Sequence, residues 1–293
     1  MPQATLLHTT VYSYERPVRL GPQMIRLRPM PNPRAPQPRY SLRVSPQPTA
    51  LHWLVDPLGN LVARAVVPGP TDRLRIEVEL GLDLSPRNPF DFVLDPDAVR
   101  WPFRYAPDQA DTLAMFRQPD HPGPLLAGML AEIAPVSDTP VPDTPVLDTV
   151  AFVLALGAAV RDRVAYVQRN APGVWPPDRT LAEGQGSCRD TAWLLVQLLR
   201  LNGVAARFVS GYLLQPPVPG APMPPDAELH AWAEAFLPGA GWLGVDPTSG
   251  LLTAEGHVAI AASPDPSGAA PLVGTVEPAR VTLETSIVVE LLP

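Results

Sequence analysis

Proline is the residue that most restricts how this chain can fold, because it accounts for 41 of the 293 residues. Proline lacks a backbone N–H and breaks the interior of a helix, so the chain favours loops, rigid turns and edge strands over long helices. A hydrophobic fraction of 46% still provides for a sizeable core. Collagen-like and fully disordered classes are disfavoured at that apolar content.

The first hundred residues alternate between apolar and polar side chains. The clearest stretch is 73–84, where Leu74, Ile76 and Val78 fall on one face and charged residues on the other. Period-two patterning with frequent turn residues is typical of antiparallel sheets with one solvated face. We therefore expect an N-terminal antiparallel β domain over residues 1–105, with strands at 6–14, 40–44, 51–55, 61–67 and 73–84.

Residues 106–147 differ in composition from both neighbouring regions. A helix is predicted over 125–133, and residues 136–150 contain three near-copies of a five-residue unit, VSDTP, VPDTP and VLDTV. Three such short units cannot form a solenoid. We interpret 106–147 as a helical connection followed by a Pro-rich linker.

The second half predicts a mixed arrangement of helices and strands. Asp148 or Thr149 can cap a helix to about Val164, and a buried helix over 188–202 ends before Gly203. Strands are expected at 204–214, 229–236, 242–246 and 281–292. The fold class is therefore α+β, with a catalytic core at 148–250 and C-terminal strands at 251–293 packing on the rest.

Charge and composition limit the classes of partner that we expect for this chain. The net charge is −7, all 22 basic residues are arginines, and no basic apolar leader is visible at the N-terminus. A nucleic-acid partner is disfavoured by this balance. The longest apolar run, 150–160, is too short to span a membrane. We expect a cytoplasmic protein without membrane, metal or other cofactor, and the oligomeric state stays open.

Cys188 is the one cysteine, so no internal disulfide can form and a cysteine-based metal site is disfavoured. It follows Gly186 and Ser187 at the predicted start of a buried helix. Free N–H groups and the helix dipole favour a negative group there, which suits a thiolate nucleophile. A small buried apolar cysteine is the competing interpretation.

His230 and Asp246 lie on two predicted strands joined by a turn near Pro238. A hairpin would bring them side by side. A thiol nucleophile needs an imidazole to take its proton and a third group to fix the imidazole tautomer. A hydrogen-bonded strand histidine and a turn aspartate are the alternatives, and the spacing alone does not decide between them.

Three motifs in this order carry a specific resemblance: GSCRD at 186–190, LHAWAE at 229–234 and PGAGWLGVDPT at 238–248. Together they resemble the bacterial transglutaminase-like family, whose core is similar to the papain-type thiol protease fold. The first half also resembles the N-terminal region found with that core, through residues 8–14, 16–18, 25–29 and 88–92. The resemblance covers nearly the whole chain.

The resemblance implies a catalytic triad of Cys188, His230 and Asp246. The Cys188 backbone N–H would be the first oxyanion donor, and the Gln185 side chain or the Trp175 indole is a candidate for the second. Tyr212 and Trp232 are candidates for lining the site. Asp190 is expected to cap the first turn of the helix that begins at Cys188, and His257 is expected to be structural.

The implied chemistry is acyl transfer through a Cys188 thioester on amide or isopeptide bonds of a peptide or protein substrate. Hydrolysis is the leading prediction. Transglutamination with an amine acceptor is one alternative, and a non-catalytic peptide-binding module is another. No calcium-binding loop motif is present in the sequence, so calcium-dependent cross-linking is not favoured.

Overall fold

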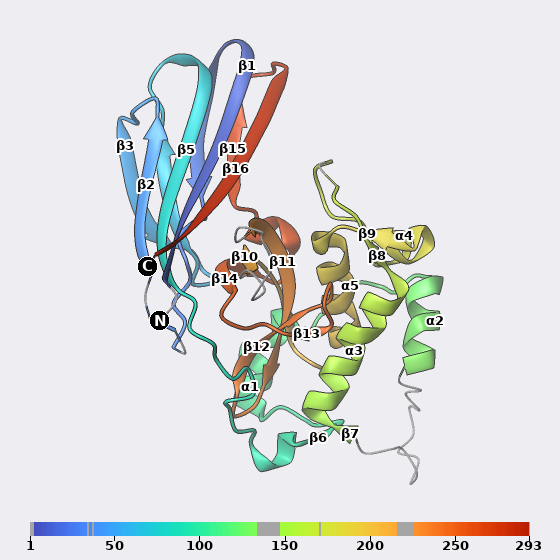
Figure 1. The fold of residues 1–293 in the computed structure, drawn as a ribbon. Coiled ribbons are helices and arrows are strands. Elements are labelled where there is room, and N and C mark those ends of the chain that lie inside the picture. Colours follow the sequence, from blue (N-terminus) through green and yellow to red (C-terminus); the bar gives the residue numbers. More distant parts are fainter. Residues whose placement is uncertain are drawn as a thin grey trace.

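The computed structural model describes residues 3–33, 35–36, 38–133, 147–169, 171–215 and 226–292. It contains two antiparallel sheets, with a layer of helices on one side of the second sheet (Figure 1). This α+β arrangement confirms the predicted fold class. The near-repeat at 136–150 falls largely outside the described residues, and so does the proline-rich sequence at 216–225.

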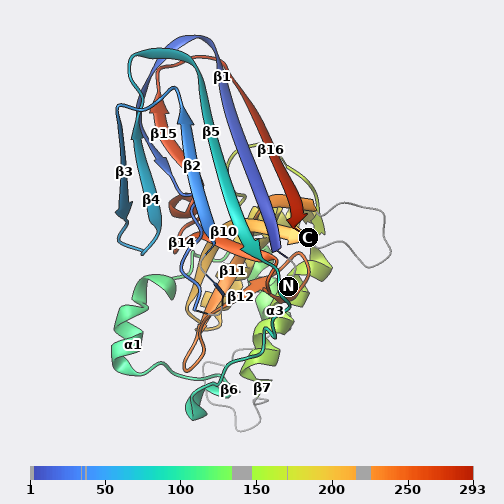
Figure 2. The ribbon, with the colours of Figure 1, turned by 60° about the vertical axis from the view of Figure 1, so that its left-hand side comes forward.

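The N-terminal sheet is built around β1 (Gln3–Ile25), which runs almost the full length of the sheet (Figure 2). The first half of β1 pairs with β5, and its last residues pair with β4. The main strand order is β2-β5-β1-β4-β3. The remaining strands of this path are β2 (Arg39–Ser45), β3 (Ala50–Val55), β4 (Leu61–Val66) and β5 (Pro70–Asp83).

Strand β1 is longer than the predicted 6–14 and contains two prolines, Pro17 and Pro22. The register with β5 is broken between Ser13 and Val18. Glu15, Arg16 and Pro17 are exposed in that interval. Pro17 therefore occupies a position that owes no N–H to β5, where a strand tolerates proline.

The two ends of the chain share one sheet. Strand β15 (Leu272–Val276) pairs with the second half of β1, and β16 (Val281–Leu292) pairs with its first half, from Gln3 to Tyr14. The C-terminal strands thus complete the N-terminal sheet. The division into blocks 1–105, 106–147, 148–250 and 251–293 stays a prediction. One hydrogen-bonded sheet joins the first block to the last.

The helical layer contains the two helices predicted for the core. α3 (Thr149–Arg163) is capped by Asp148, whose carboxylate accepts the Ala151 N–H at 2.9 Å. α5 (Cys188–Leu201) is buried over nearly its whole length. Further helices are α1 (Pro107–Thr112), α2 (Pro124–Ile133) and α4 (Pro177–Glu183), with 3-10 turns at Pro96–Ala98, Ala114–Phe116 and Pro266–Ala269.

The core sheet has the order β13-β12-β11-β10-β14. Its strands are β10 (Ala206–Gln215), β11 (Asp226–Leu237), β12 (Gly241–Asp246), β13 (Leu251–Leu252) and β14 (His257–Ser263). Two short ladders connect the surrounding segments: β6 (Arg100–Trp101) with β7 (Leu147–Asp148), and β8 (Ala165–Tyr166) with β9 (Gln185–Gly186).

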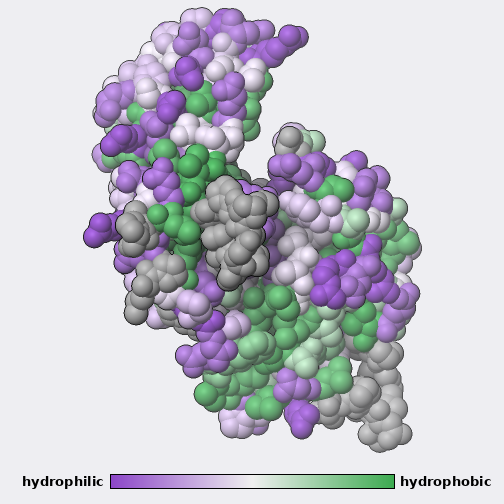
Figure 3. All heavy atoms as spheres, viewed as in Figure 1, coloured by the Kyte–Doolittle hydropathy of each residue, from purple (hydrophilic) through white to green (hydrophobic). Residues whose placement is uncertain are grey.

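The core sheet packs against both the helices and the N-terminal sheet. Ala231 and Ala233 belong to the apolar core formed with α5, whereas Tyr212 and Ile260 belong to the core formed with the N-terminal sheet. On the face shown in Figure 3, a notch separates the lobe built by the long strands from the helical side. No helix among the described residues is long and apolar enough to cross a membrane.

Candidate active site

Cys188 occupies the first position of α5, directly after the N-cap residue Ser187. The chain packs closely at Gly186, because a Cβ there would lie 3.1 Å from the Cβ of Asp190 and 3.2 Å from Thr180 Cγ2. This close packing holds the start of the helix. The Cys188 thiol is buried among core residues, next to the free N–H groups of the first helical turn.

Asp190 holds this helix start in place. Its carboxylate is fully buried and accepts the Ser187 backbone N–H at 2.9 Å and the Ser187 hydroxyl at 2.7 Å. Arg169 donates to both of its oxygens, at 3.1 and 2.7 Å. The Trp175 backbone N–H adds a further hydrogen bond at 2.8 Å. Although burial opposes ionisation, these donors keep the pKa of Asp190 below its usual range.

His230 and Asp246 meet across the hairpin of β11 and β12. The Nε2 atom of His230 lies 3.1 Å from Oδ2 of Asp246, and both side chains are buried. Since a carboxylate only accepts hydrogen bonds, Nε2 carries the proton and donates it to Asp246. The sequence-based expectation that a strand hairpin places these residues together is therefore matched by the geometry.

A second histidine, His257, donates to the same carboxylate oxygen at 3.2 Å. Its Nδ1 accepts the Ala254 N–H at 3.4 Å, which leaves the proton on Nε2. The other oxygen, Oδ1, accepts the backbone N–H and the hydroxyl of Thr248 at 2.9 and 2.8 Å. Asp246 therefore has four donors, although it is almost fully buried.

These contacts determine the protonation states of His230 and Asp246. Burial alone would raise the pKa of Asp246, but the hydrogen bonds from His230 and His257 hold it far below its ordinary value. For His230, burial lowers the pKa, whereas interactions with Asp246, Cys188 and Glu228 outweigh it and raise the pKa to about 11. The imidazolium form of His230 is thus strongly favoured beside the Asp246 carboxylate.

The second ring nitrogen of His230, Nδ1, faces away from Asp246. Cys188 lies close enough to contribute to the raised pKa of His230. The Glu228 carboxylate is on the same side, with Oε1 3.5 Å from Nδ1. Nδ1 is buried and has no hydrogen-bond partner among the described residues, whereas Nε2 serves the Asp246 carboxylate.

The other candidate site residues, Gln185, Trp175, Tyr212 and Trp232, lie in different places. Gln185 is exposed on β9. Trp175 is half-buried, and its ring stacks between the guanidinium groups of Arg169 and Arg179 at 4.7 and 4.3 Å. No described contact links either side chain to Cys188, so the second oxyanion donor stays a prediction for both.

The structure separates Tyr212 from the reacting groups. Its ring is fully buried between the two sheets, and its hydroxyl bonds Nδ1 of His8 at 2.9 Å. It therefore joins the N-terminal sheet to the core and does not line the Cys188 site. Trp232 is buried behind the site, where its ring meets His257 edge to face at a centroid distance of 5.4 Å.

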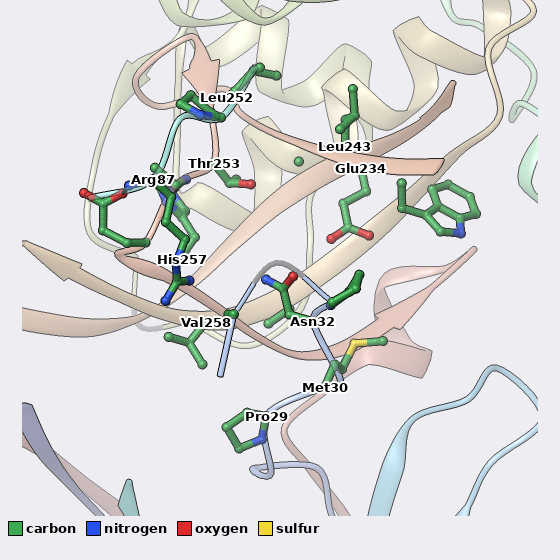
Figure 4. Close-up of a pocket in the computed structure, with 18 of the residues that line it drawn as sticks. Pro29, Met30, Asn32, Arg87, Glu234, Leu243, Leu252, Thr253, His257 and Val258 are labelled. Carbon is green, nitrogen blue, oxygen red and sulfur yellow. Dashed lines mark hydrogen bonds between the residues drawn. The ribbon is translucent and has the colours of Figure 1, made fainter. Parts of the chain in front are cut away.

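His257 and Trp232 help to line a cavity of about 750 Å³, part of which is shown in Figure 4. Pro29, Met30 and Asn32 form part of its wall, and Glu234 and His257 another part. Cys188, His230 and Asp246 are not among its lining residues. This cavity and the candidate catalytic side chains therefore occupy different places.

Three side chains near the site were not predicted to act there: His257, Glu228 and Tyr166. His257 follows the three motifs in sequence and was expected to be structural. Glu228 could have been found from alternation, because it lies two residues before His230 on the same strand. In the described part of the chain, no group of three or more His, Cys, Asp or Glu side chains is suited to hold a metal ion.

Comparison with known families agrees with this architecture. Residues 4–83 match the bacterial transglutaminase-like N-terminal region, and residues 142–247 match the transglutaminase-like superfamily. The two matches cover more than half of the chain, and the second contains the three motifs' Cys188, His230 and Asp246. Fold and matches define a thiol-enzyme superfamily. The chain belongs to the bacterial transglutaminase-like proteins, which confirms the resemblance found in its sequence.

Individual relatives extend the comparison. An uncharacterized protein of Mycobacterium tuberculosis is 26% identical over 242 residues, which are 81% of this chain and 76% of that protein. An uncharacterized protein of Mycobacterium leprae is 32% identical over 113 residues, or 38% of this chain and 39% of its own length. The crystal structure of a putative cysteine protease from Cytophaga hutchinsonii aligns with a TM-score of 0.66 at 18% identity, covering 100% and 92% of the two chains. That likeness shows a shared fold.

Proposed function

We propose that the protein is a cysteine-dependent hydrolase of amide or isopeptide bonds in peptides, with Cys188, His230 and Asp246 as its triad. The observation that carries this proposal is the different use of the two His230 nitrogens: Nε2 bonds Asp246 at 3.1 Å, and Nδ1 has no hydrogen-bond partner among the described residues, so it is free for the Cys188 thiol at the start of α5. A triad needs this division of labour between the two ring nitrogens.

The reaction runs in two steps. The sulfur of Cys188 attacks the amide carbonyl carbon, the C–S bond forms and the C–N bond breaks. The thiol proton, held on Nδ1 of His230, passes to the leaving nitrogen. Water then attacks the thioester, His230 takes its proton, and the C–S bond breaks to release the acid and restore the thiol. Asp246 stays ionised throughout and accepts the hydrogen bond from Nε2–H, which holds the imidazole in place.

The Cys188 backbone N–H is the first candidate for stabilising the oxyanion, because it belongs to the unpaired first turn of α5. The helix dipole adds positive potential at the same place. The tight packing at Gly186 and the bonds to Asp190 fix this N–H before substrate arrives. Such preorganisation is the main source of electrostatic catalysis in acyl transfer.

The test uses the single thiol of the chain. Wild type, His230→Ala and the control His52→Ala, which changes an exposed histidine on β3, are alkylated with iodoacetamide from pH 4 to 10 and followed by mass. At pH 6 we expect wild type and His52→Ala to react about tenfold or more faster than His230→Ala. An inert thiol, or identical profiles for all three proteins, would contradict the proposal.

A peptide library incubated in water, with and without a labelled amine, then identifies the acceptor. Hydrolysis predicts released products without incorporation of the amine, and Cys188→Ala should abolish product formation. Incorporation of the label would identify a transglutaminase. Retention of peptides by wild type and Cys188→Ala alike, with no turnover in either protein, would identify a binding module.

A further inference from the structure

Two polar side chains stand at the exposed edge of the Cys188 site, and the reaction steps above do not use them. Glu228 lies on β11 two residues before His230, so both side chains leave the same face of the strand. Its carboxylate is 3.5 Å from Nδ1 of His230 and 40% exposed. Tyr166 is 47% exposed on β8 and pairs in register with Gly186, two residues before Cys188.

Burial and the charges of Glu228, Cys188 and Asp246 raise the pKa of Tyr166 to about 12. The phenol therefore keeps its proton at physiological pH and is able to donate a hydrogen bond. Tyr166 and Glu228 thus form a small polar edge of the site. Solvent reaches this edge from one side, and Nδ1 of His230 lies on the other side.

The His230 imidazolium is the cation beside Glu228, and it faces two carboxylates, Asp246 at 3.1 Å and Glu228 at 3.5 Å, so it does not neutralise both. The chain contains no lysine. Arg169 is committed to Asp190, and Arg189 donates to the carbonyl oxygens of Arg169 and Ala171. Within the ranges that the structure describes, no arginine lies within 4.0 Å of the Glu228 carboxylate. A half-exposed carboxylate at the rim of a reactive centre is consequently available to a cation from outside.

The position of Glu228 relates it to one side of the substrate. Nδ1 of His230 delivers the proton to the leaving nitrogen, so groups around Nδ1 face the leaving part of the substrate. We propose that Glu228 and Tyr166 bind a protonated amine on this leaving side. The substrates are then peptides or amides that carry a positive charge next to the scissile bond. This inference rests on the proposed function and specifies its substrate class.

The proposal is tested by measuring how the charge of a reagent affects its rate at Cys188. Three methanethiosulfonates are used, with 2-aminoethyl, methyl and 2-sulfonatoethyl groups, which are cationic, neutral and anionic. Each forms a mixed disulfide at the single thiol and is followed by mass at pH 7. Because any change in thiolate fraction affects all three reagents, the ratio of cationic to neutral rate isolates attraction of the charge.

Wild type is compared with Glu228→Gln, Tyr166→Phe and the control Glu183→Gln. The control removes the same charge from a side chain that is 45% exposed on α4. We expect Glu228→Gln to lower the cationic-to-neutral ratio roughly fivefold to tenfold, the range for a hydrogen-bonded charge pair at a half-exposed site. Tyr166→Phe should lower it about twofold to threefold by the loss of a neutral hydrogen bond. Glu183→Gln should leave the ratio unchanged.

The outcomes separate this proposal from the one on which it rests. Equal ratios in wild type and Glu228→Gln, with alkylation that still depends on His230, would overturn the cation site and leave the hydrolase proposal intact. A thiol inert to all three reagents would remove both. A peptide pair with lysine or norleucine after the scissile bond supplies the substrate-level check, and wild type should cleave the lysine peptide at least fivefold faster by kcat/KM, with the preference lost in Glu228→Gln.

Discussion

His230 and His257 donate to the same oxygen of Asp246, at 3.1 and 3.2 Å. One histidine comes from β11 and the other from β14, at opposite sides of β10. The ring centroids are 6.3 Å apart. His257 therefore fixes the acceptor that orients His230, and we regard it as a positioning residue.

Replacement of His257 by phenylalanine should lower the His230-dependent alkylation rate of Cys188 about tenfold and the free energy of unfolding by about 2 kcal/mol. The physical reason is the loss of a charge-assisted hydrogen bond to a buried carboxylate. His257→Gln, which retains an N–H donor, should recover most of the loss. Urea unfolding and the alkylation assay measure the two effects. Equal rates in wild type and His257→Phe would contradict the positioning role.

The pair of His230 and Asp246 should make stability depend on pH. The folded-state pKa of His230 is raised from 6.5 to about 11, so its contribution is complete below pH 6.5 and is lost as pH rises toward 11. The lowered pKa of Asp246 gives a contribution that is present above about pH 4 and lost at lower pH. The stability advantage of wild type over His230→Gln should therefore be largest near pH 5–6.

Urea unfolding of both proteins at pH 5.5, 7.5 and 9.5 measures this advantage. We expect it to shrink by about 1–3 kcal/mol across the series. His52→Gln should follow wild type at every pH because His52 is exposed on β3. A constant difference between wild type and His230→Gln from pH 5.5 to 9.5 would show that His230 is not held as an imidazolium.

Asp190 should be among the most sensitive positions for stability. Its side chain is fully buried and ion-paired with Arg169 at 2.7 Å. Asp190→Ala leaves that arginine and the Ser187 N–H without their acceptor, at a cost of about 3–5 kcal/mol. A double-mutant cycle with Arg169→Ala should recover part of the loss. Additive losses in the double variant would show that the two side chains do not act as a unit.

His8 should make the joint between the two sheets sensitive to acid. Burial lowers the pKa of His8 to about 4, below its ordinary value of 6.5. The neutral ring is thus favoured in the folded protein, and stability is lost as pH falls from 6.5 toward 4. The shift corresponds to about 3 kcal/mol.

His8→Asn should therefore be less stable than wild type at pH 7.5 but lose less on acidification to pH 4.5. Tyr212→Phe, which removes the partner hydroxyl, should cost about 1 kcal/mol at pH 7.5 and keep the acid sensitivity. Thermal or urea unfolding at the two pH values distinguishes the effects. Parallel losses of stability in wild type and His8→Asn would exclude His8 as the source.

Much of this architecture follows from sequence patterns. The helix at Cys188 was predictable because its cap and buried length are local properties, and it runs from Cys188 to Leu201 with Gly203 just beyond. The alternation at 73–84 identified β5 because one face of that strand is buried. The triad candidates were predictable because three specific motifs carry them.

Relationships between distant segments were not predictable in this way. His257 reaches Asp246 through the pairing of β10 with β14, whose register shifts between Ser210 and Gly211. No local periodicity records such a shift. Tyr212 was a candidate for lining the site, but it packs in the core formed with the N-terminal sheet. Glu228 matters through its distance to Nδ1, which a one-dimensional pattern does not contain.

The shared sheet of the two chain ends has a consequence for folding order. Ala4 pairs with Leu291 and Tyr14 with Val281, so this ladder joins segments separated by almost the whole chain. During synthesis, the side of β1 that receives β16 keeps unpaired N–H and C=O groups until the last strand has been made. The segment containing Cys188, His230 and Asp246 emerges before that ladder can close. Assistance by a chaperone would therefore be needed most in this interval, when an open strand edge favours association between chains.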